Sequence, residues 1–109
     1  MPIYIHEKEY EILIDDKEIK VIHTPGHTVG SVCYKIDNDL YTGDTLFKGT
    51  VGRWDFPTGK LDILRKTVVD LIDSQDEDTK IHPAHGESST IKHEKETNYY
   101  YNEWKNIVK

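Results

Sequence analysis

The stretch that decides the fold runs from residue 19 to residue 36 and reads Ile-Lys-Val-Ile-His-Thr-Pro-Gly-His-Thr-Val-Gly-Ser-Val-Cys-Tyr-Lys-Ile. Its two ends, residues 19–23 and 31–36, are rich in β-branched and aromatic side chains with partial alternation, which favours two strands. Between them, Pro25 presets the first central position of a turn, and Gly26 tolerates the positive φ of the second. The stretch therefore predicts a strand, a tight turn that carries His27, and a second strand.

Segments of the same kind lie on both sides of this stretch. Further short strands are predicted over residues 3–5, 40–42 and 80–82, and the Gly-rich run 48–59 is predicted to be a loop. Apolar residues at helical spacing predict amphipathic helices over residues 61–73 and 89–108. The order of strands, helix, strand and helix predicts an α/β fold of the α+β type.

Composition limits the classes of function that are possible. The chain has 109 residues, which predicts one domain over 1–109, and its formal charge is −6 with no basic stripe. That charge argues against nucleic acid or an anionic membrane surface as the main partner. The longest apolar runs are too short to span a membrane, and the N-terminus does not resemble a secretion signal. A single cysteine, Cys33, cannot form a disulfide framework, so we expect a cytoplasmic setting.

Three metal-capable side chains each follow a predicted strand, in a turn that contains Gly or Pro: His27, Asp44 and His85. Because residues that leave neighbouring strands at one sheet edge converge, we expect these three to lie together. Two imidazoles and a carboxylate suit Zn²⁺, Fe²⁺ or Mn²⁺, and three protein ligands leave one position open for water. Taken singly, each residue is better explained as an ordinary solvated or turn residue. The repeated strand–turn–ligand order is what favours a site for one ion.

The other histidines are weaker candidates. His23 lies four residues before His27, but Pro25 and Gly26 exclude the helix that a zinc pair at this spacing needs. We expect His6 and His93 to be surface residues, and His82 to orient a loop or face solvent. Cys33 is expected to be a small buried hydrophobe. The sequence shows no Ser-His-Asp arrangement, dinucleotide fingerprint or phosphate loop.

Read in order, four motifs resemble the metallo-β-lactamase-fold hydrolases, and within them the bacterial glyoxalase II-like (hydroxyacylglutathione hydrolase-like) enzymes. They are His23-Thr24-Pro25-Gly26-His27-Thr28-Val29-Gly30-Ser31, Thr42-Gly43-Asp44-Thr45-Leu46-Phe47, Gly52-Arg53-Trp54-Asp55-Phe56-Pro57 and His82-Pro83-Ala84-His85-Gly86-Glu87. The resemblance covers about residues 19–99. It implies half of an αββα sandwich, the C-terminal half, with a mixed, mostly antiparallel sheet and two main helices.

The resemblance also implies roles for single residues. His27 would be a late ligand of a first metal, His85 a late ligand of a second, and Asp44 the carboxylate that bridges the two. The family hydrolyses thioesters or esters of small molecules with metal-activated water, and Arg53 would contact the substrate. No catalytic residue is assigned.

The main departure from the family concerns the first metal ligands. The family's first ligands lie in a His-x-His-x-Asp-His block, and no His-x-His occurs in these 109 residues. One ion would be held by this chain, and two only if a missing half is supplied. We expect a homo-oligomer or a partner chain to cover the exposed sheet face, because large bare apolar surfaces are rare on monomers. Three interpretations remain: a hydrolase completed by another chain or by a segment outside these 109 residues, a remnant or binding module with or without one metal ion, and a structural half without chemistry.

Overall fold

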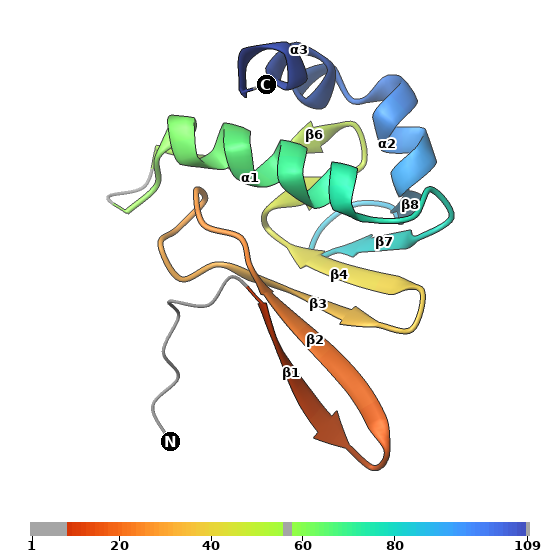
Figure 1. The fold of residues 1–109 in the computed structure, drawn as a ribbon. Helices are drawn as coiled ribbons and strands as arrows, with labels where there is room; N and C mark the ends of the chain where they lie inside the picture. Colours follow the sequence, from red (N-terminus) through yellow and green to blue (C-terminus); the bar gives the residue numbers. More distant parts are fainter. Residues whose placement is uncertain (1–8, 56–57, 109) are drawn as a thin grey trace.

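The computed structural model describes residues 9–55 and 58–108, so the strand predicted over residues 3–5 and His6 lie outside the described residues. One six-stranded sheet organises the chain, with the strands in the order β1-β2-β3-β4-β7-β8 (Figure 1). All neighbouring strands in it are antiparallel except β4 and β7, which pair in parallel. Its strands are β1 (Glu9–Ile14), β2 (Lys17–His23), β3 (Val32–Ile36), β4 (Asp39–Gly43), β7 (Lys80–Pro83) and β8 (Ser89–Thr90).

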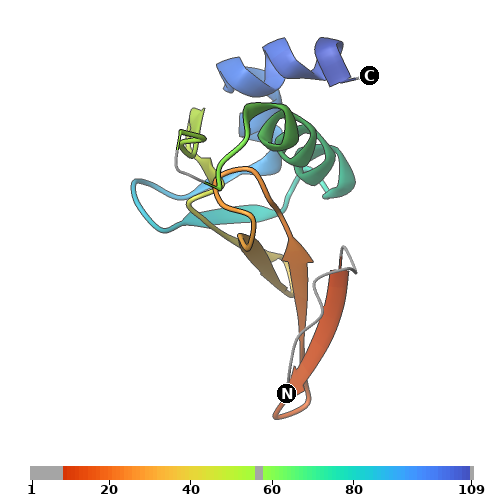
Figure 2. The ribbon, with the colours of Figure 1, turned by 90° about the vertical axis from the view of Figure 1, so that its left-hand side faces the viewer.

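A small hairpin and the helices complete the architecture. The hairpin consists of β5 (Leu46–Phe47) and β6 (Thr50–Val51), and the helices are α1 (Leu61–Ser74), α2 (Ile91–Thr97) and α3 (Tyr99–Val108). All three helices lie on the same side of the sheet, and the β1–β2 hairpin extends away from them (Figures 1 and 2). The predicted fold class, a mixed α/β chain with a mostly antiparallel sheet, is confirmed.

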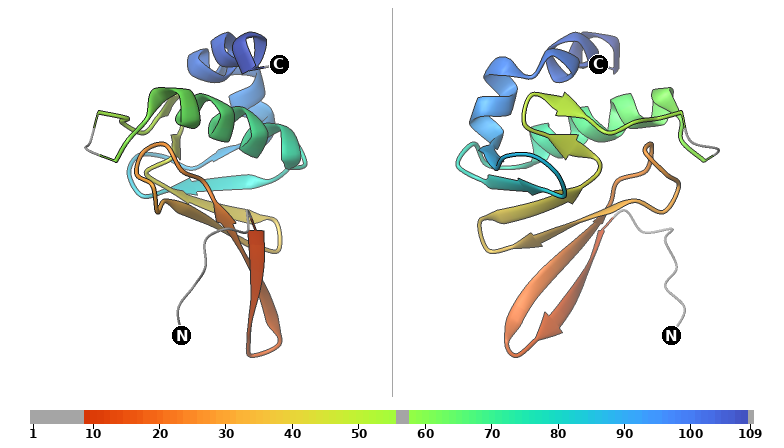
Figure 3. Two further views of the ribbon diagram at one scale, coloured as in Figure 1. Left: turned by 60° about the vertical axis from the view of Figure 1, so that its left-hand side comes forward. Right: turned by 180° about the vertical axis from the view of Figure 1, so that it is seen from behind.

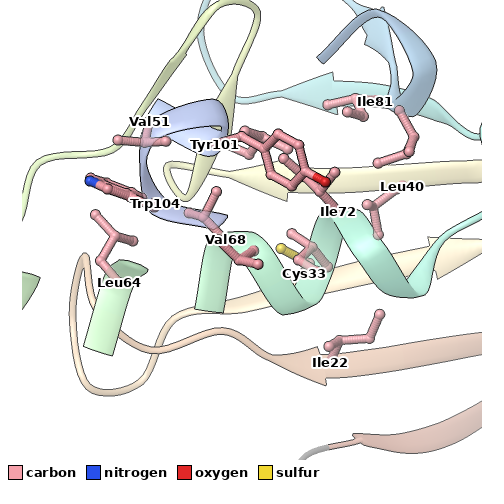
Figure 4. Close-up of a cluster of buried hydrophobic side chains, with 14 residues drawn as sticks. Ile22, Cys33, Leu40, Val51, Leu64, Val68, Ile72, Ile81, Tyr101 and Trp104 are labelled. Carbon is pink, nitrogen blue, oxygen red and sulfur yellow. The ribbon is translucent and has the colours of Figure 1, made fainter. Parts of the chain in front are cut away.

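The core lies between the sheet and α1. Leu64, Val68 and Ile72 repeat along one face of α1 and are fully buried. They pack in one cluster with side chains from the facing strands and from α3, which Figure 4 draws: Ile22, Cys33, Leu40, Ile81, Tyr101 and Trp104. The helical spacing that predicted residues 61–73 is therefore the spacing of the buried face.

The opposite face of the sheet carries a second apolar surface. Side chains directly across from each other in antiparallel strands share a face, and the register pairs Ile19 with Ile36, Val21 with Tyr34, and Tyr34 with Tyr41. Among the described residues no helix lies on this side, as the two views of Figure 3 show. Tyr34 and Tyr41 are 44% and 43% exposed. Val21 is only 1% exposed, so we call the other four residues, Ile19, Tyr34, Ile36 and Tyr41, the open face.

Several elements differ from the sequence-based expectation. Strand β1 and the two-residue strands β5, β6 and β8 were not predicted, and β6 lies inside the predicted loop 48–59. The second predicted helix is two helices, because Asn98 interrupts it and its side-chain Oδ1 accepts the backbone N–H of Tyr101 at 3.1 Å. In the part of the chain that the structure covers, no helix is long and apolar enough to cross a membrane.

Candidate metal centre

Three loops at one edge of the sheet bring the predicted ligands together. His27 follows β2, Asp44 follows β4 directly, and His85 lies two residues beyond β7. The Nε2 atom of His27 lies 3.9 Å from Oδ2 of Asp44, and the Nε2 atom of His85 lies 3.6 Å from Oδ1 of the same carboxylate. The three side chains, separated by 17 and 41 residues in sequence, therefore meet around Asp44, as expected.

The two imidazoles face different oxygens of one carboxylate. Both nitrogen–oxygen separations are too long for hydrogen bonds. Two donors roughly 2.1 Å from a tetrahedral ion lie about 3.4 Å apart, so the observed separations are close to those of donors that share an ion. The donor set of imidazole nitrogen and carboxylate oxygen suits zinc or iron. These residues fit a metal ion in two pairs, His27 with Asp44 and His85 with Asp44.

The structure does not show the single three-ligand site that the sequence predicted. Among residues 9–55 and 58–108, no group of three or more His, Cys, Asp or Glu side chains is arranged to hold a metal ion. The physical reason is the orientation of Asp44, which presents one oxygen to each imidazole. The expectation of one ion bound by all three side chains stays a prediction, and the structure arranges them as two pairs that share the Asp44 carboxylate.

The backbone orients His27 for coordination. Its Nδ1–H donates to the backbone carbonyl of Arg53 at 2.8 Å, so the proton is on Nδ1 and the lone pair of Nε2 faces Asp44. A second hydrogen bond of this kind fixes the tautomer and orientation of metal-binding histidines. The His27 side chain is 15% exposed, whereas the His85 side chain is 81% exposed and has the ring of Phe47 at 6.3 Å. The two ligand pairs therefore differ in how firmly the imidazole is held.

Two glycines allow the close approach of the loops. A Cβ atom on Gly52 would overlap the carbonyl oxygen of Asp44 and would lie 3.2 Å from Nδ1 of His27. Gly26 has a φ of 135°, and a Cβ there would lie 2.5 Å from the Cα of Leu64. The first glycine lets the loop after the β5–β6 hairpin approach both ligands, and the second lets the His27 loop pack on α1.

Arg53 acts in the structure through its backbone. Sequence analysis assigned it a substrate contact, which no ligand tests and which stays a prediction. Its guanidinium forms an ion pair with Asp55 through Nε at 2.9 Å and Nη2 at 3.2 Å, and this hydrogen bond lowers the pKa of the Asp55 carboxyl. Sequence reasoning missed the contribution of the Arg53 carbonyl to His27, because no side-chain pattern indicates where a carbonyl points.

The remaining candidates lie away from Asp44. Cys33 is buried as expected, and burial raises the pKa of its thiol to about 11. His93 is exposed, also as expected. Sequence reasoning missed a hydrogen-bonded series in which Ser88 contacts Nδ1 of His82, and Nε2 of His82 contacts Asp39. In serine hydrolases the carboxylate contacts Nδ1 and the serine contacts Nε2, so this series has the reverse order.

Comparison with known proteins identifies the family. The sequence matches the family model described as the metallo-beta-lactamase superfamily over residues 5–91. This chain belongs to that superfamily. GloC of Haemophilus influenzae, a hydroxyacylglutathione hydrolase, is 35% identical to this chain over 99 residues, which are 87% of this chain and 46% of GloC.

Solved structures agree with the assignment to the superfamily. The crystal structure of BLEG-1 B3 metallo-beta-lactamase has a TM-score of 0.80 and 33% identity, over 88% of this chain and 46% of that chain. The structure of TTHA1623 in a di-iron-bound form has a TM-score of 0.77 and 30% identity, over 92% of this chain and 49% of that chain. This superfamily chain therefore spans less than half the length of the relatives that it matches.

The candidate metal centre lies away from two hollows of the molecule. Two hollows occur among the described residues, with volumes of about 900 Å³ and about 420 Å³. The larger lies between β2 and α1, the smaller lies beside His82 and Ser88, and His27, Asp44 and His85 line neither. The ligands lie outside both hollows, with His85 81% exposed and Asp44 43% exposed.

Proposed function

We propose that this chain supplies the Asp44 part of a metal-dependent hydrolase site that acts on a thioester or ester of a small molecule. The observation that carries the proposal is the position of two imidazoles against the two oxygens of Asp44. Membership of the superfamily supports hydrolysis, and the 35% identity to a hydroxyacylglutathione hydrolase supports a thioester substrate.

Each residue of the site has a defined task in this proposal. When bound, a zinc or iron ion would lower the pKa of a water molecule and polarise a carbonyl. Asp44 supplies the negative charge that attracts the cation, and the Arg53 carbonyl keeps His27 in the tautomer that leaves Nε2 unprotonated. The guanidinium of Arg53, 66% exposed and paired with Asp55, is available to exchange that carboxylate for one on the substrate.

In this proposal, residues outside these 109 complete the site. The 109 residues contain no His-x-His, and the described ligands form two pairs rather than a closed set. We therefore propose that a partner chain completes the ligand set, and that this partner or a second copy covers the open face. Exposed apolar surface on Tyr34 and Tyr41 supports this arrangement. The single buried Cys33 supports a cytoplasmic location.

A second function is favoured by the same incomplete ligand set. In this alternative the chain is a binding module that holds a metal ion without turnover. It differs from the first proposal in one measurable respect, because metal would bind but no thioester would be hydrolysed in any combination of chains.

Metal analysis beside a thioester hydrolysis assay tests both functions. We expect the chain to bind Zn²⁺, and Asp44→Asn to lose that ion because both imidazoles lose their charged partner. Asp70→Asn, on α1, is the control and is expected to leave binding unchanged. Hydrolysis is expected only after addition of a chain that carries a His-x-His-x-Asp-His block. No metal under replete conditions would exclude both functions, whereas turnover by the chain alone, lost in Asp44→Asn, would exclude the binding module.

A further inference from the structure

Two histidines outside the ligand pairs each contact a residue at the far end of a ligand-bearing loop, one through a backbone carbonyl and the other through a hydroxyl. His23, the last residue of β2, donates from Nε2 to the carbonyl oxygen of Val29 at 2.8 Å. His82, on β7, contacts the Ser88 hydroxyl through Nδ1 at 3.1 Å. In both cases the partner lies six residues further along the chain. Each contact closes a loop at its base.

Each closed loop contains one of the candidate metal ligands. His27 lies within the loop that His23 closes, and His85 lies within the loop that His82 closes. The first loop is also closed by a backbone hydrogen bond from Thr24 to Ser31 at 2.8 Å. The two contacts thus occur at corresponding places, at the point where a strand passes into a ligand-bearing turn.

His82 is itself held in one orientation. Its Nε2–H donates to Oδ1 of Asp39 at 2.7 Å, which leaves Nδ1 to accept the hydroxyl hydrogen of Ser88. The ring of Tyr41 lies 5.0 Å from the imidazole, measured between ring centroids. A carboxylate on β4, an imidazole on β7 and a hydroxyl at the end of the loop therefore form one connected series.

The loop that carries His85 depends most on such a contact. The His85 side chain is 81% exposed, so core packing does not hold it. Backbone N–H of Ala84 donates to the carbonyl of Gly43 at 2.9 Å, and Lys48 pairs with Glu87 at 2.8 Å. The Lys48–Glu87 pair is exposed, and exposed ion pairs contribute little to order. Beyond the ligand, the chain is next fixed where β8 begins, through the pairing of Ser89 with Ile81, and the contact of Ser88 with His82 lies one residue before that point.

We propose that His23 and His82 are positioning residues, which set the two ligand loops so that His27 and His85 face the oxygens of Asp44. The proposal rests on the proposed function for its consequence, which is metal affinity. Loss of a group that orients a ligand typically weakens metal binding 10- to 100-fold.

Zinc titration of the full chain tests the proposal. His82→Phe and His23→Phe keep an aromatic ring but lose the hydrogen bonds, and each is expected to weaken Zn²⁺ binding about 10- to 100-fold. Gln at either position restores a donor and an acceptor, so His82→Gln and His23→Gln are expected to recover part of the affinity. His93→Phe, an exposed histidine on α2, is the matched control and is expected to bind Zn²⁺ as the unmodified chain does.

Amide hydrogen exchange of the metal-free chain gives a readout that does not depend on the ion. Faster exchange is expected over residues 84–88 in His82→Phe and over residues 27–30 in His23→Phe, each without effect on the other loop. Ser88→Ala removes the same contact but only one hydroxyl and little packing. If His82→Phe does not fold, faster exchange over residues 84–88 is expected in Ser88→Ala instead.

The two proposals fail in different ways. If the unmodified chain binds no Zn²⁺, the proposed function is wrong, and loop-specific exchange still decides the role of the two histidines. If both Phe variants bind Zn²⁺ normally and exchange normally, the positioning role is wrong and the metal site stands. Labelling of Ser88 by a fluorophosphonate would also overturn the proposal, because it would make His82 the base of a nucleophile.

Discussion

Glu94 is a carboxylate enclosed in the core, and donors from three segments surround it. It accepts from the backbone N–H of Gly49 at 2.9 Å, the hydroxyl of Ser89 at 2.6 Å and the amide of Asn98 at 2.9 Å. The residue is fully buried. These contacts join α2 to β8 and to the turn of the β5–β6 hairpin.

Replacement of Glu94 by leucine is expected to be strongly destabilising. Three buried donors would lose their acceptor, and the unfolding free energy should fall by about 3 kcal/mol or more. Urea unfolding followed by circular dichroism measures the change. Glu96→Leu, on the exposed face of the same helix, should change stability by less than about 0.5 kcal/mol. Equal losses in the two variants would contradict this account of Glu94.

Cys33 should make the fold sensitive to alkali. Burial raises the pKa of its thiol from 9.0 to about 11, so the unfolded chain loses this proton at lower pH than the folded chain does. The contribution to stability is complete below pH 9 and is lost as the pH rises from 9 towards 11, by on the order of 2 kcal/mol. Unfolding free energies measured across this range should fall more steeply for the unmodified chain than for Cys33→Ala.

A parallel pH profile for Cys33→Ala would show that the thiol does not titrate as described. Tyr101 acts in the same direction at higher pH, because burial and the carboxylate of Asp73 raise its pKa to about 12. That residue is present in both chains, so it cancels in the comparison.

The residues of the candidate site were predictable from sequence, but their geometry was not. The repeated strand–turn–ligand order was enough to place His27, Asp44 and His85 together, because neighbouring strands end at a common sheet edge. The order does not tell which carboxylate oxygen each imidazole faces, since that depends on side-chain torsions. The hydrogen bond between His27 and the Arg53 carbonyl could not be predicted for a similar reason, because every residue type has a backbone carbonyl and the sequence does not show where it points.

Among the secondary structure elements, the loop from β2 to β3 depends most on one residue. Gly26 has a φ of 135°, and its amide lies against the first turns of α1. Gly26→Ala is expected to lower the unfolding free energy by at least about 2 kcal/mol, because the methyl group meets the backbone of Leu64 and the positive φ is strained. Thermal unfolding measures the loss.

Gly30 offers a matched control in the same loop. A Cβ atom there would have no heavy atom within 4 Å, so Gly30→Ala should leave the melting temperature nearly unchanged. If Gly26→Ala were equally harmless, the loop would not pack on α1 as described.

Elements with long regular patterns were predicted, and elements set by tertiary contacts were not. The strands over 19–23, 31–36, 40–42 and 80–82 and the helix over 61–73 correspond to β2, β3, β4, β7 and α1 within one or two residues. Strand β1 was missed because Glu9 and Glu11 interrupt its apolar pattern, and the exposure of Ile12 and Leu13 shows that this edge of the sheet needs no buried stripe. Asp15 and Asp16 in its turn both have positive φ, a conformation that glycine adopts more readily than aspartate, so the turn was not evident from the sequence.

The open face is expected to set the oligomeric state of the chain in solution. We expect sedimentation velocity to find a dimer or higher oligomer. Tyr34→Lys places a charge on the open face and should shift the population towards monomer. Tyr99→Lys alters a more exposed tyrosine on α3, on the helical side, and should leave the distribution unchanged. A monodisperse monomer for the unmodified chain would contradict the covering of this face by a second copy.

The parallel pairing of β4 with β7 has a consequence for the order of events during folding. The two strands are joined through the β5–β6 hairpin and the whole of α1, and only their alignment brings His85 to Asp44. Such pairings between distant segments form late, because the conformational entropy lost on closing the long connecting loop opposes them. An ion at this centre would therefore bind and stabilise a chain that has already folded, whereas zinc fingers fold only when the ion binds.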